Sequence, residues 1–393
     1  MAKLGHEVVG VDVLESQVAA LAQGQAPFYE PGLPELLTEA SATGRLRFTT
    51  DPSEAAGAQV HFVCVGTPQK RGENAADLRY VHGAIDDLLP HLKPGDVVVG
   101  KSTVPVGTAE QMAERIRIAV PEATLLWNPE FLREGHAVDD TLRPDRFVYG
   151  VEDGPAGAQA VTRLDAVYAE TLAAGTPRLI TDLATAQLVK VAANSFLATK
   201  ISFINAMAEL CEVSGADVTV LADAIGLDER IGRRFLNAGL GFGGGCLPKD
   251  IRAFMARAGE LGADQALTFL REVDSINLRR RVRMVDLARE ELGGSIANRR
   301  IAVLGAAFKP HSDDVRDSPA LSVAAQMQLQ GAHVTVTDPW AIDNARKKWP
   351  DLAFATEVEQ ALTGAELVLV ATEWPEYVGL DPAVAAKHVT SRG

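Results

Sequence analysis

Cysteine is scarce in this sequence, and so are the marks of several common protein classes. Three cysteines in 393 residues make no disulfide framework, which favours a reducing compartment. Cys64 and Cys211 have apolar or helix-forming neighbours and should be buried. No apolar run is long enough to span a membrane, and no secretory signal pattern opens the chain. We therefore expect a cytoplasmic protein.

Basic residues are also in the minority. The sequence has 38 lysines and arginines against 52 acidic residues, a net charge of −14. This excess of negative charge argues against nucleic acid or an anionic membrane as a partner. The eight histidines show no spacing typical of a metal site, so no metal is expected.

Short apolar runs alternate with helical stretches in the first third of the chain. Runs of this kind suit strands that are buried on both faces, and the alternation predicts a parallel, doubly wound sheet. The predicted strands are residues 8–11, 60–65, 97–100 and 124–127, and the predicted helices between them include 15–22, 78–89 and 109–118.

The pattern then changes twice. It is almost wholly helical over residues 183–289, with no strong breaker between Thr185 and Ser214, and a second α/β pattern begins at residue 300. We predict an α/β protein with two Rossmann-like doubly wound domains joined by a long central helix and a helical middle region. The predicted domain bounds are 1–182, 183–295 and 296–393.

Asp12 ends the first apolar run. Dinucleotide-binding sheets place an acid there to receive the adenosine ribose hydroxyls, although such an aspartate can also simply cap the next turn. The fingerprint G-x-G-x-x-G should lie about 20 residues earlier, but only eleven residues precede Asp12. We expect the first strand and its glycine turn to be missing, which would expose two strand edges. A start codon placed too late is the favoured explanation, and a fragment is the other.

Two pairs of polar residues have helical spacing. Glu130 and Glu134 follow a predicted strand, and their carboxylates would share a face if the segment were helical. Lys190 and Asn194 lie among apolar residues of the long helix, at an edge that should be partly buried. A lysine there can stabilise an oxyanion, and the amide can fix a hydroxyl or a water. Each pair alone is also compatible with an ordinary surface.

The stretch 239–250 is the sharpest signal. Five glycines in its first seven residues would let backbone N–H groups approach a ligand. Pro248 suits a first helical turn, which puts Cys246 near a helix N-terminus, where the dipole and Lys190 or Lys249 would favour a thiolate. Asp250 could orient a water or move a proton. A glycine-rich hinge with an incidental cysteine is the less favoured alternative.

The loop after the first strand of the last domain, residues 305–319, contains two cations. Lys309 and Arg316 lie where a nucleotide would bind in such a fold, although an ordinary polar loop would look similar.

Together these segments resemble the UDP-glucose/GDP-mannose dehydrogenase family, over the whole length of the chain. Residues 228–232 look most like the UDP-glucose branch. The stretches that carry the resemblance are 65–68, 101–108, 128–135, Lys190 to Asn194, 241–250 and 308–319.

The resemblance implies NAD as the cofactor and a homodimer formed on the long helix. It also implies a four-electron oxidation of a nucleotide sugar at C6, with Cys246 capturing the aldehyde and Glu130 activating the water that hydrolyses the thioester. Lys190, Asn194 and Asp250 would stabilise the alkoxide, and Thr103 would line the cofactor or hold the catalytic water. The cofactor would contact Asp12, Thr67, Thr103, Glu134 and Arg316.

The resemblance further assigns the nucleotide sugar to a set of positions, with Arg230 reaching across a dimer. These positions are Phe131, Leu132, Arg133, Glu134, Lys190, Asn194, Arg230, Phe242, Gly243, Gly245, Phe308 and Lys309. The sequence departs from the family pattern at the absent glycine fingerprint and at Gln17, where a basic residue is usual. We also expect the chain to be short at its C-terminal end.

Three alternatives remain open at this stage. One is the same chemistry on GDP-mannose or a UDP-N-acetylhexosamine, since sugar selectivity depends on pocket shape. Another is a single-step 3-hydroxyacid dehydrogenase, against which Cys246 and the third domain argue. The last is a non-catalytic paralogue or fragment that only binds.

Overall fold

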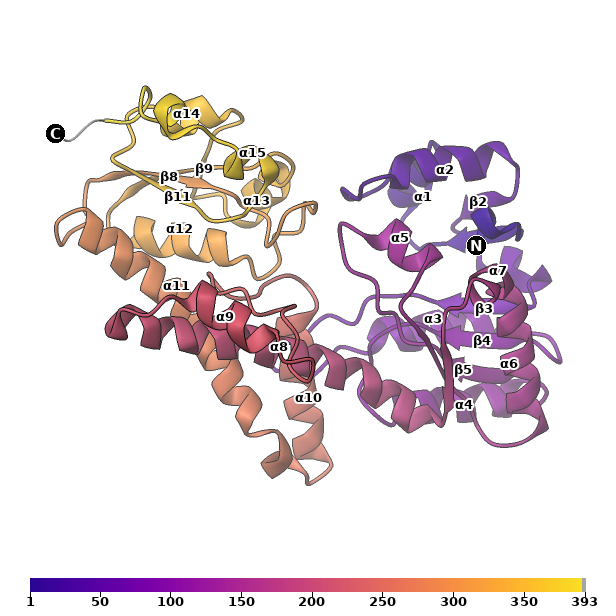
Figure 1. The fold of residues 1–393 in the computed structure, drawn as a ribbon. Helices are drawn as coiled ribbons and strands as arrows, with labels where there is room; N and C mark the ends of the chain where they lie inside the picture. Colours follow the sequence, from indigo (N-terminus) through magenta and orange to yellow (C-terminus); the bar gives the residue numbers. More distant parts are fainter. Residues whose placement is uncertain (391–393) are drawn as a thin grey trace. The chain divides into compact units, whose positions relative to one another are not determined.

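The computed structural model describes residues 1–390 and contains two compact units (Figure 1). Unit 1 comprises residues 1–193 and 252–260, and unit 2 comprises residues 194–251 and those from 261 onward. Two helices contribute to both units: α8 (Leu183–Ser214) and α10 (Leu247–Glu260). The predicted α/β class and the unbroken helix from Thr185 to Ser214 are confirmed. Within residues 1–390, no helix is long and apolar enough to cross a membrane.

The strands of unit 1 form two sheets. One is the parallel pair β1–β2, and the other has the order β3-β4-β5-β6-β7. Its neighbours are parallel except β5 and β6, which meet antiparallel at Trp127 and Gly150. The strands are β1 (Val8–Val11), β2 (Leu46–Thr49), β3 (Val60–Val63), β4 (Val97–Gly100), β5 (Thr124–Trp127), β6 (Phe147–Gly150) and β7 (Arg178–Thr181).

Helices connect these strands, and three of them match the sequence prediction to within one residue at each end: α1, α3 and α4. The helices of unit 1 are α1 (Glu15–Ala22), α2 (Leu33–Ala42), α3 (Arg79–Leu88), α4 (Thr108–Ala119), α5 (Ala137–Leu142), α6 (Pro155–Val167) and α7 (Ala169–Ala173), with 3-10 turns at Ala2–Leu4, Pro52–Gly57 and Leu89–His91.

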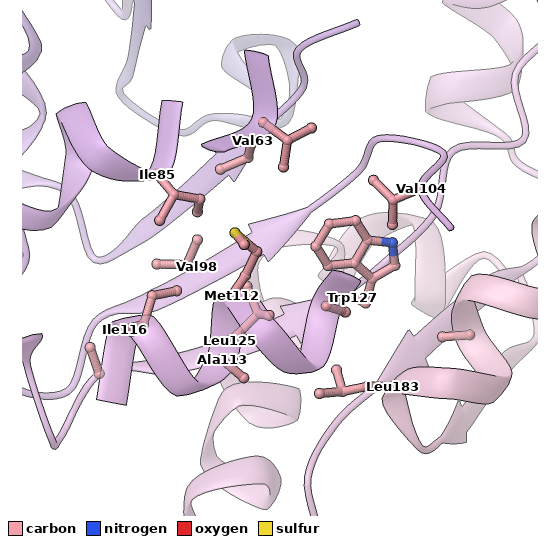
Figure 2. Close-up of a cluster of buried hydrophobic side chains, with 14 of the residues drawn as sticks. Val63, Ile85, Val98, Val104, Met112, Ala113, Ile116, Leu125, Trp127 and Leu183 are labelled. Carbon is pink, nitrogen blue, oxygen red and sulfur yellow. The ribbon is translucent and has the colours of Figure 1, made fainter. Parts of the chain in front are cut away.

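Strand β4 lies at the centre of the unit 1 core because its side chains alternate between two apolar layers. Val98 faces the layer built by α3 and α4, where Ile85, Met112 and Ile116 are almost completely buried (Figure 2). Val97 and Val99 face the opposite layer, which includes α6. Each fully buried aliphatic side chain contributes about 1.5–3 kcal/mol. The two covered faces explain why β4 reads as a continuous run of valines.

The prediction that residues 8–11 form a strand buried on both faces is wrong in its burial. β1 is half-buried along three residues and exposed at Val11. Within residues 1–390, β1 pairs only with β2 and β3 pairs only with β4, so each has one edge without a neighbouring strand. The two exposed strand edges expected from the sequence are therefore present, and they leave β1 without the cover of a central strand.

Unit 2 contains a parallel sheet of order β10-β9-β8-β11, the doubly wound arrangement. Its central strand β8 is buried from Ile301 to Leu304. The strands are β8 (Arg300–Leu304), β9 (His333–Thr337), β10 (Ala353–Phe354) and β11 (Leu367–Val370). The remaining helical segments are α9 (Val218–Gly226), Asp264–Leu267 (a 3-10 turn), α11 (Phe269–Glu291), α12 (Pro319–Leu329), α13 (Ile342–Lys348), α14 (Val358–Leu362), α15 (Pro375–Val378) and α16 (Pro382–Ala385).

Candidate active site

The carboxyl ends of β3 and β4 in unit 1 are joined by side-chain hydrogen bonds. Thr67 is buried, and its Oγ1 donates to the carbonyl oxygen of Thr103 at 2.7 Å. Ser102 Oγ donates to the carbonyl oxygen of Val65 at 2.6 Å. Two threonines selected from the sequence therefore touch, at the edge where open α/β sheets bind ligands.

Glu130 lies beside a lysine that the sequence analysis did not select. Its Oε2 is 3.1 Å from Nζ of Lys101, whose side chain is largely buried. Lys101 Nζ also donates to Oδ1 of Asn128 at 3.1 Å. The other carboxylate oxygen of Glu130 accepts hydrogen bonds from the backbone N–H groups of Phe131 and Leu132. These contacts fix the carboxylate of Glu130 at the end of β5. The position of Lys101 directly after β4 is the sequence feature that could have identified it as a site residue.

The segment from Asn128 to His136 is not helical, so the condition under which Glu130 and Glu134 would share a face is not met. Two hydrogen bonds to a buried glutamate explain the irregular path: Glu30 accepts from the N–H groups of Gly135 and Ala137, both at 2.7 Å. Glu30 thereby satisfies N–H groups at the start of α5. It lies more than a hundred residues away in sequence, and no local pattern marks it.

Two cations lie near the ring of Phe131. Cζ of Arg146 lies 4.0 Å from the ring centroid, and Nζ of Lys190 lies 5.4 Å from it. The next cation, Arg133, donates two hydrogen bonds from its guanidinium to Asp140, which holds the pKa of that carboxyl below its usual range. Unit 1 thus brings Lys190 and Phe131 together, while Arg133 is engaged with Asp140.

In unit 2, Asn194 and Asp250 meet in the protein interior. Nδ2 of Asn194 donates to Oδ2 of Asp250 at 2.6 Å, and both side chains are buried. Nζ of Lys249 lies 2.5 Å from the other oxygen of Asp250. This arrangement orients the amide and compensates the buried carboxylate.

Cys246 directly precedes α10, as the position of Pro248 predicts, and its side chain is exposed. A helix N-terminus favours negative charge, so this location suits a thiolate. Cys211 is buried as expected, but the expectation of burial is wrong for Cys64, which is exposed. Cys64 follows β3, whose outer edge has no neighbouring strand in the described residues, and that edge leaves it uncovered.

The glycines before Cys246 are packed against the loop 305–319. A Cβ on Gly243 would lie 2.5 Å from the carbonyl oxygen of Asp317, and one on Gly244 would lie 2.8 Å from the ring of Phe308. A Cβ on Gly245 would lie 2.1 Å from Cζ of Arg316. The N–H of Gly244 donates to the carbonyl oxygen of Arg316 at 2.8 Å. The absence of a Cβ at these glycines therefore lets the loop 305–319 approach closely.

Phe242 is fixed by polar residues of α11. Asn277, which is completely buried, accepts from the N–H of Phe242 at 2.7 Å and donates to its carbonyl oxygen at 3.0 Å. Arg281 donates to Oδ1 of Asp317 at 2.9 Å. Sequence analysis missed both side chains, because their partners lie more than thirty residues away.

The cations expected at the nucleotide lie on irregular segments of unit 2. Nζ of Lys309 is 5.4 Å from the ring centroid of Phe308. Arg316 pairs with Asp314, which is two residues away. The exposed Arg230 makes the same kind of pair with Asp228. Each pair shares a short loop, so it orients an arginine without removing it from the surface.

NAD requires an acceptor for its ribose hydroxyls, and Asp12 fits that role. The carboxylate is partly exposed at the end of β1, with Oδ1 accepting from the N–H of Leu14 at 2.9 Å. Thr67 and Thr103 lie at the carboxyl ends of β3 and β4 in the same unit. The residues present in unit 1 therefore suit the adenosine side of a dinucleotide.

Parallel sheets with polar groups at their carboxyl ends, and with a thiol at a helix start, place the chain in the class of nucleotide-binding α/β enzymes. Models of the UDP-glucose/GDP-mannose dehydrogenase family match three consecutive parts of it. The NAD binding domain matches residues 1–172, the central domain residues 184–279 and the UDP binding domain residues 302–392.

Individual proteins agree with this result. The UDP-glucose 6-dehydrogenase of Rhizobium meliloti is 43% identical over 97% of this chain and 87% of its own length. The structure of a UDP-glucose dehydrogenase from Pyrobaculum islandicum has a TM-score of 0.89 and 40% identity, over 97% of this chain and 87% of that one. The structure of UDP-D-ManNAc dehydrogenase from Pyrococcus horikoshii has a TM-score of 0.86 but 25% identity, over 100% and 89% of the two chains. The chain belongs to the UDP-glucose/GDP-mannose dehydrogenase family, and it is an NAD-dependent nucleotide-sugar dehydrogenase.

Proposed function

We propose that this chain oxidises the C6 alcohol of UDP-glucose to a carboxylate, giving UDP-glucuronate. The observation that carries the proposal is the exposed thiol of Cys246 at the start of α10, on the helix that also holds Asp250 against Asn194. Identity supports UDP-glucose as the sugar, because the two relatives named for it are 43% and 40% identical and the one named for UDP-D-ManNAc is 25% identical.

The first oxidation needs a group that stabilises the alkoxide formed when the C6 hydroxyl loses its proton. Lys190 supplies a positive charge for it, and Asn194 supplies an amide whose orientation Asp250 fixes. The buried position of Asn194 and Asp250 strengthens these interactions, because little water competes for them. NAD, when bound, accepts the hydride in each of the two oxidations.

Cys246 and Glu130 divide the second half of the reaction. The thiolate of Cys246 adds to the aldehyde carbon and forms a thiohemiacetal, and loss of a second hydride from that carbon leaves a thioester. Glu130 takes a proton from water, whose oxygen attacks the thioester, so that the carbon–sulfur bond breaks and the carboxylate and the Cys246 thiolate are released. The N–H groups of Phe131 and Leu132 hold Glu130 in a defined orientation for this task.

We assign the nucleotide sugar and the cofactor to the positions expected from the sequence. Phe308 and Lys309 would contact the nucleotide, because they lie on the loop at the carboxyl end of β8. The segment from Phe131 to Glu134, together with Phe242, Gly243, Gly245 and Arg230, would complete the substrate site. Asp12, Thr67, Thr103, Glu134 and Arg316 would contact NAD.

We further propose a homodimer formed on α8. Phe196, Phe203 and Leu210 recur every seven residues on this helix, and their side chains are 65%, 45% and 58% exposed. Ile204 and Cys211, on another face of the same helix, are buried. A stripe of exposed apolar residues with this spacing is typical of a helix that packs against a second copy. Within residues 1–390 its three cysteines form no disulfide, which suits a dimer that works in the cytoplasm.

NADH formation from UDP-glucose tests the proposal. Two NADH per sugar are expected from the 393-residue chain, and Cys246→Ser should abolish the second oxidation. Glu130→Gln should instead retain an acyl group on Cys246, visible by mass spectrometry of the intact protein. No turnover with any UDP- or GDP-sugar would favour a protein that only binds.

A readout that does not need NAD separates binding from turnover. UDP-glucose should protect Cys246 from alkylation by iodoacetamide, and GDP-mannose should protect it much less. Cys64 is also exposed, so the label is quantified separately on each cysteine. Equal protection by every nucleotide sugar would contradict the proposed selectivity.

A further inference from the structure

The first four N–H groups of the loop that follows β8 in unit 2, those of residues 305–308, all donate within the protein. In dinucleotide-binding units, N–H groups of this loop and of the following helix hold the pyrophosphate. Here the N–H of Gly305 donates to the carbonyl oxygen of Thr337 at 2.8 Å, and the N–H of Phe308 donates to that of Asp314 at 3.0 Å. The N–H groups of Ala306 and Ala307 both donate to a single carboxylate oxygen.

That oxygen belongs to Asp338, which directly follows β9 and is 2% exposed. Oδ2 of Asp338 accepts from Ala306 and Ala307 at 2.8 and 3.0 Å, and from Nε1 of Trp374 at 3.1 Å. The N–H groups of Trp340 and Ala341 donate to Oδ1, both at 2.9 Å. A buried carboxylate is stable only with such compensation, and these donors surround it as they would surround a bound anion.

The start of the next helix is closed in the same way. Ser318 precedes α12, and its Oγ accepts from the N–H of Leu321 at 3.3 Å. Pro319, the first residue of α12, has no N–H to offer. Thr372 Oγ1 donates to the carbonyl oxygen of Ala307 at 2.8 Å, which ties the loop down from another side. The N–H groups of residues 305–308, directly after β8, and that of Leu321 at the start of α12 are therefore used within the protein.

We propose that Asp338 is a built-in anion: its carboxylate occupies the phosphate position of unit 2 and excludes a dinucleotide from that unit. The acid that ends a strand beside the first one ordinarily receives ribose hydroxyls. In unit 2 the same topological position turns its acid onto the loop after β8. Asp338 is thus a specificity-determining residue, because it prevents a dinucleotide from binding to unit 2. Unit 1 then remains as the dinucleotide-binding unit.

Removal of the carboxylate should create a site for a small anion. Asp338→Ala in chloride should lower the Tm by on the order of 10 °C, and sodium formate at equal ionic strength should restore a large part of that loss. Asp343→Ala is the matched control, because Asp343 lies nearby in sequence and its side chain is 87% exposed. The inference is overturned if formate changes the Tm of the two variants equally.

Three further measurements keep the test decisive. If Asp338→Ala does not fold in chloride, its refolding yield in formate against chloride replaces the Tm. Asp338→Asn preserves the shape of the side chain but turns an amide N–H₂ toward N–H donors. It should therefore be destabilised as strongly as Asp338→Ala. Wild-type stability of Asp338→Asn would show that only the volume of the side chain matters. With saturating UDP present to fill the proposed substrate site, Asp338→Gly should bind inorganic pyrophosphate at least tenfold more tightly than the wild type by calorimetry, and unchanged affinity would refute the exclusion of phosphate.

Discussion

Asp12 and Asp338 both end a strand of a parallel sheet, one in each α/β unit, and their surroundings are opposite. Asp12 is partly exposed and accepts a hydrogen bond from the N–H of Leu14. Asp338 is buried under donors from three segments of the chain. One sheet topology can therefore leave a strand-terminal acid open to solvent or surround it with donors from the protein itself. The difference lies in the donors that the tertiary structure turns toward the carboxylate.

The stability of the two units should respond very differently to loss of these charges. Asp338→Asn leaves five buried donors without a full complement of acceptors, so it should cost about 3–5 kcal/mol. Asp12→Asn should stay within about 0.5 kcal/mol, because its carboxylate is partly exposed. Denaturant unfolding monitored by circular dichroism measures both, and equal losses would remove the contrast.

The glycine-rich loop 239–245 of unit 2 allows a matched comparison, since its glycines differ in their surroundings. Gly245→Ala forces Arg316 away and should lower kcat/KM about 10- to 100-fold, as expected when catalytic groups are displaced by roughly 1 Å. Gly239→Ala is the control, because a Cβ there meets no atom within 4 Å. Similar losses in both variants would mean that flexibility, and not packing, is what the loop requires.

Affinity for the cofactor should depend on Asp12, whereas stability should depend mainly on Asp338. Asp12→Asn should raise the KM for NAD about tenfold, the equivalent of about 1.4 kcal/mol, since hydrogen bonds to a charged acceptor are worth this much. Its kcat should stay nearly unchanged. Asp343→Asn serves as a surface-charge control in unit 2. An unaltered KM for Asp12→Asn would remove Asp12 from the cofactor site.

The smallest effect is expected from a surface pair in unit 1. Arg133 lowers the pKa of Asp140, so this pair contributes stability above the unfolded carboxyl value of about 3.9 and loses it as the pH falls through the lower folded value. Both side chains keep contact with solvent, which reduces the contribution to a few tenths of a kcal/mol. Unfolding of Asp140→Asn at pH 2 to 6 should show a slightly flatter pH dependence than the wild type, and an identical slope would assign no role to the pair.

Prediction from sequence succeeded where the signal was local. The run 97–100 became β4, the helix through 185–214 became α8, and Pro248 located the helix start beside Cys246. β6 and β7 were missed although they are as long as β4, so length was not the reason; β7 is exposed along three of its four residues and lacks an unbroken apolar run. The sequence did not exclude a helix after Asn128. Glu30, which holds this segment in another conformation, is distant in sequence.

The sequence by itself determined the two α/β patterns, the long helix between them and the residue types available for chemistry. These follow from apolar periodicity and from proline and glycine positions, which act over a few residues. Only the tertiary structure decided that Lys101 meets Glu130, that Gly245 makes room for Arg316 and that Asp338 fills an anion position. Each of these contacts joins segments far apart in the chain, and a hydrogen bond or a close approach exists only once folding has set the distance between them.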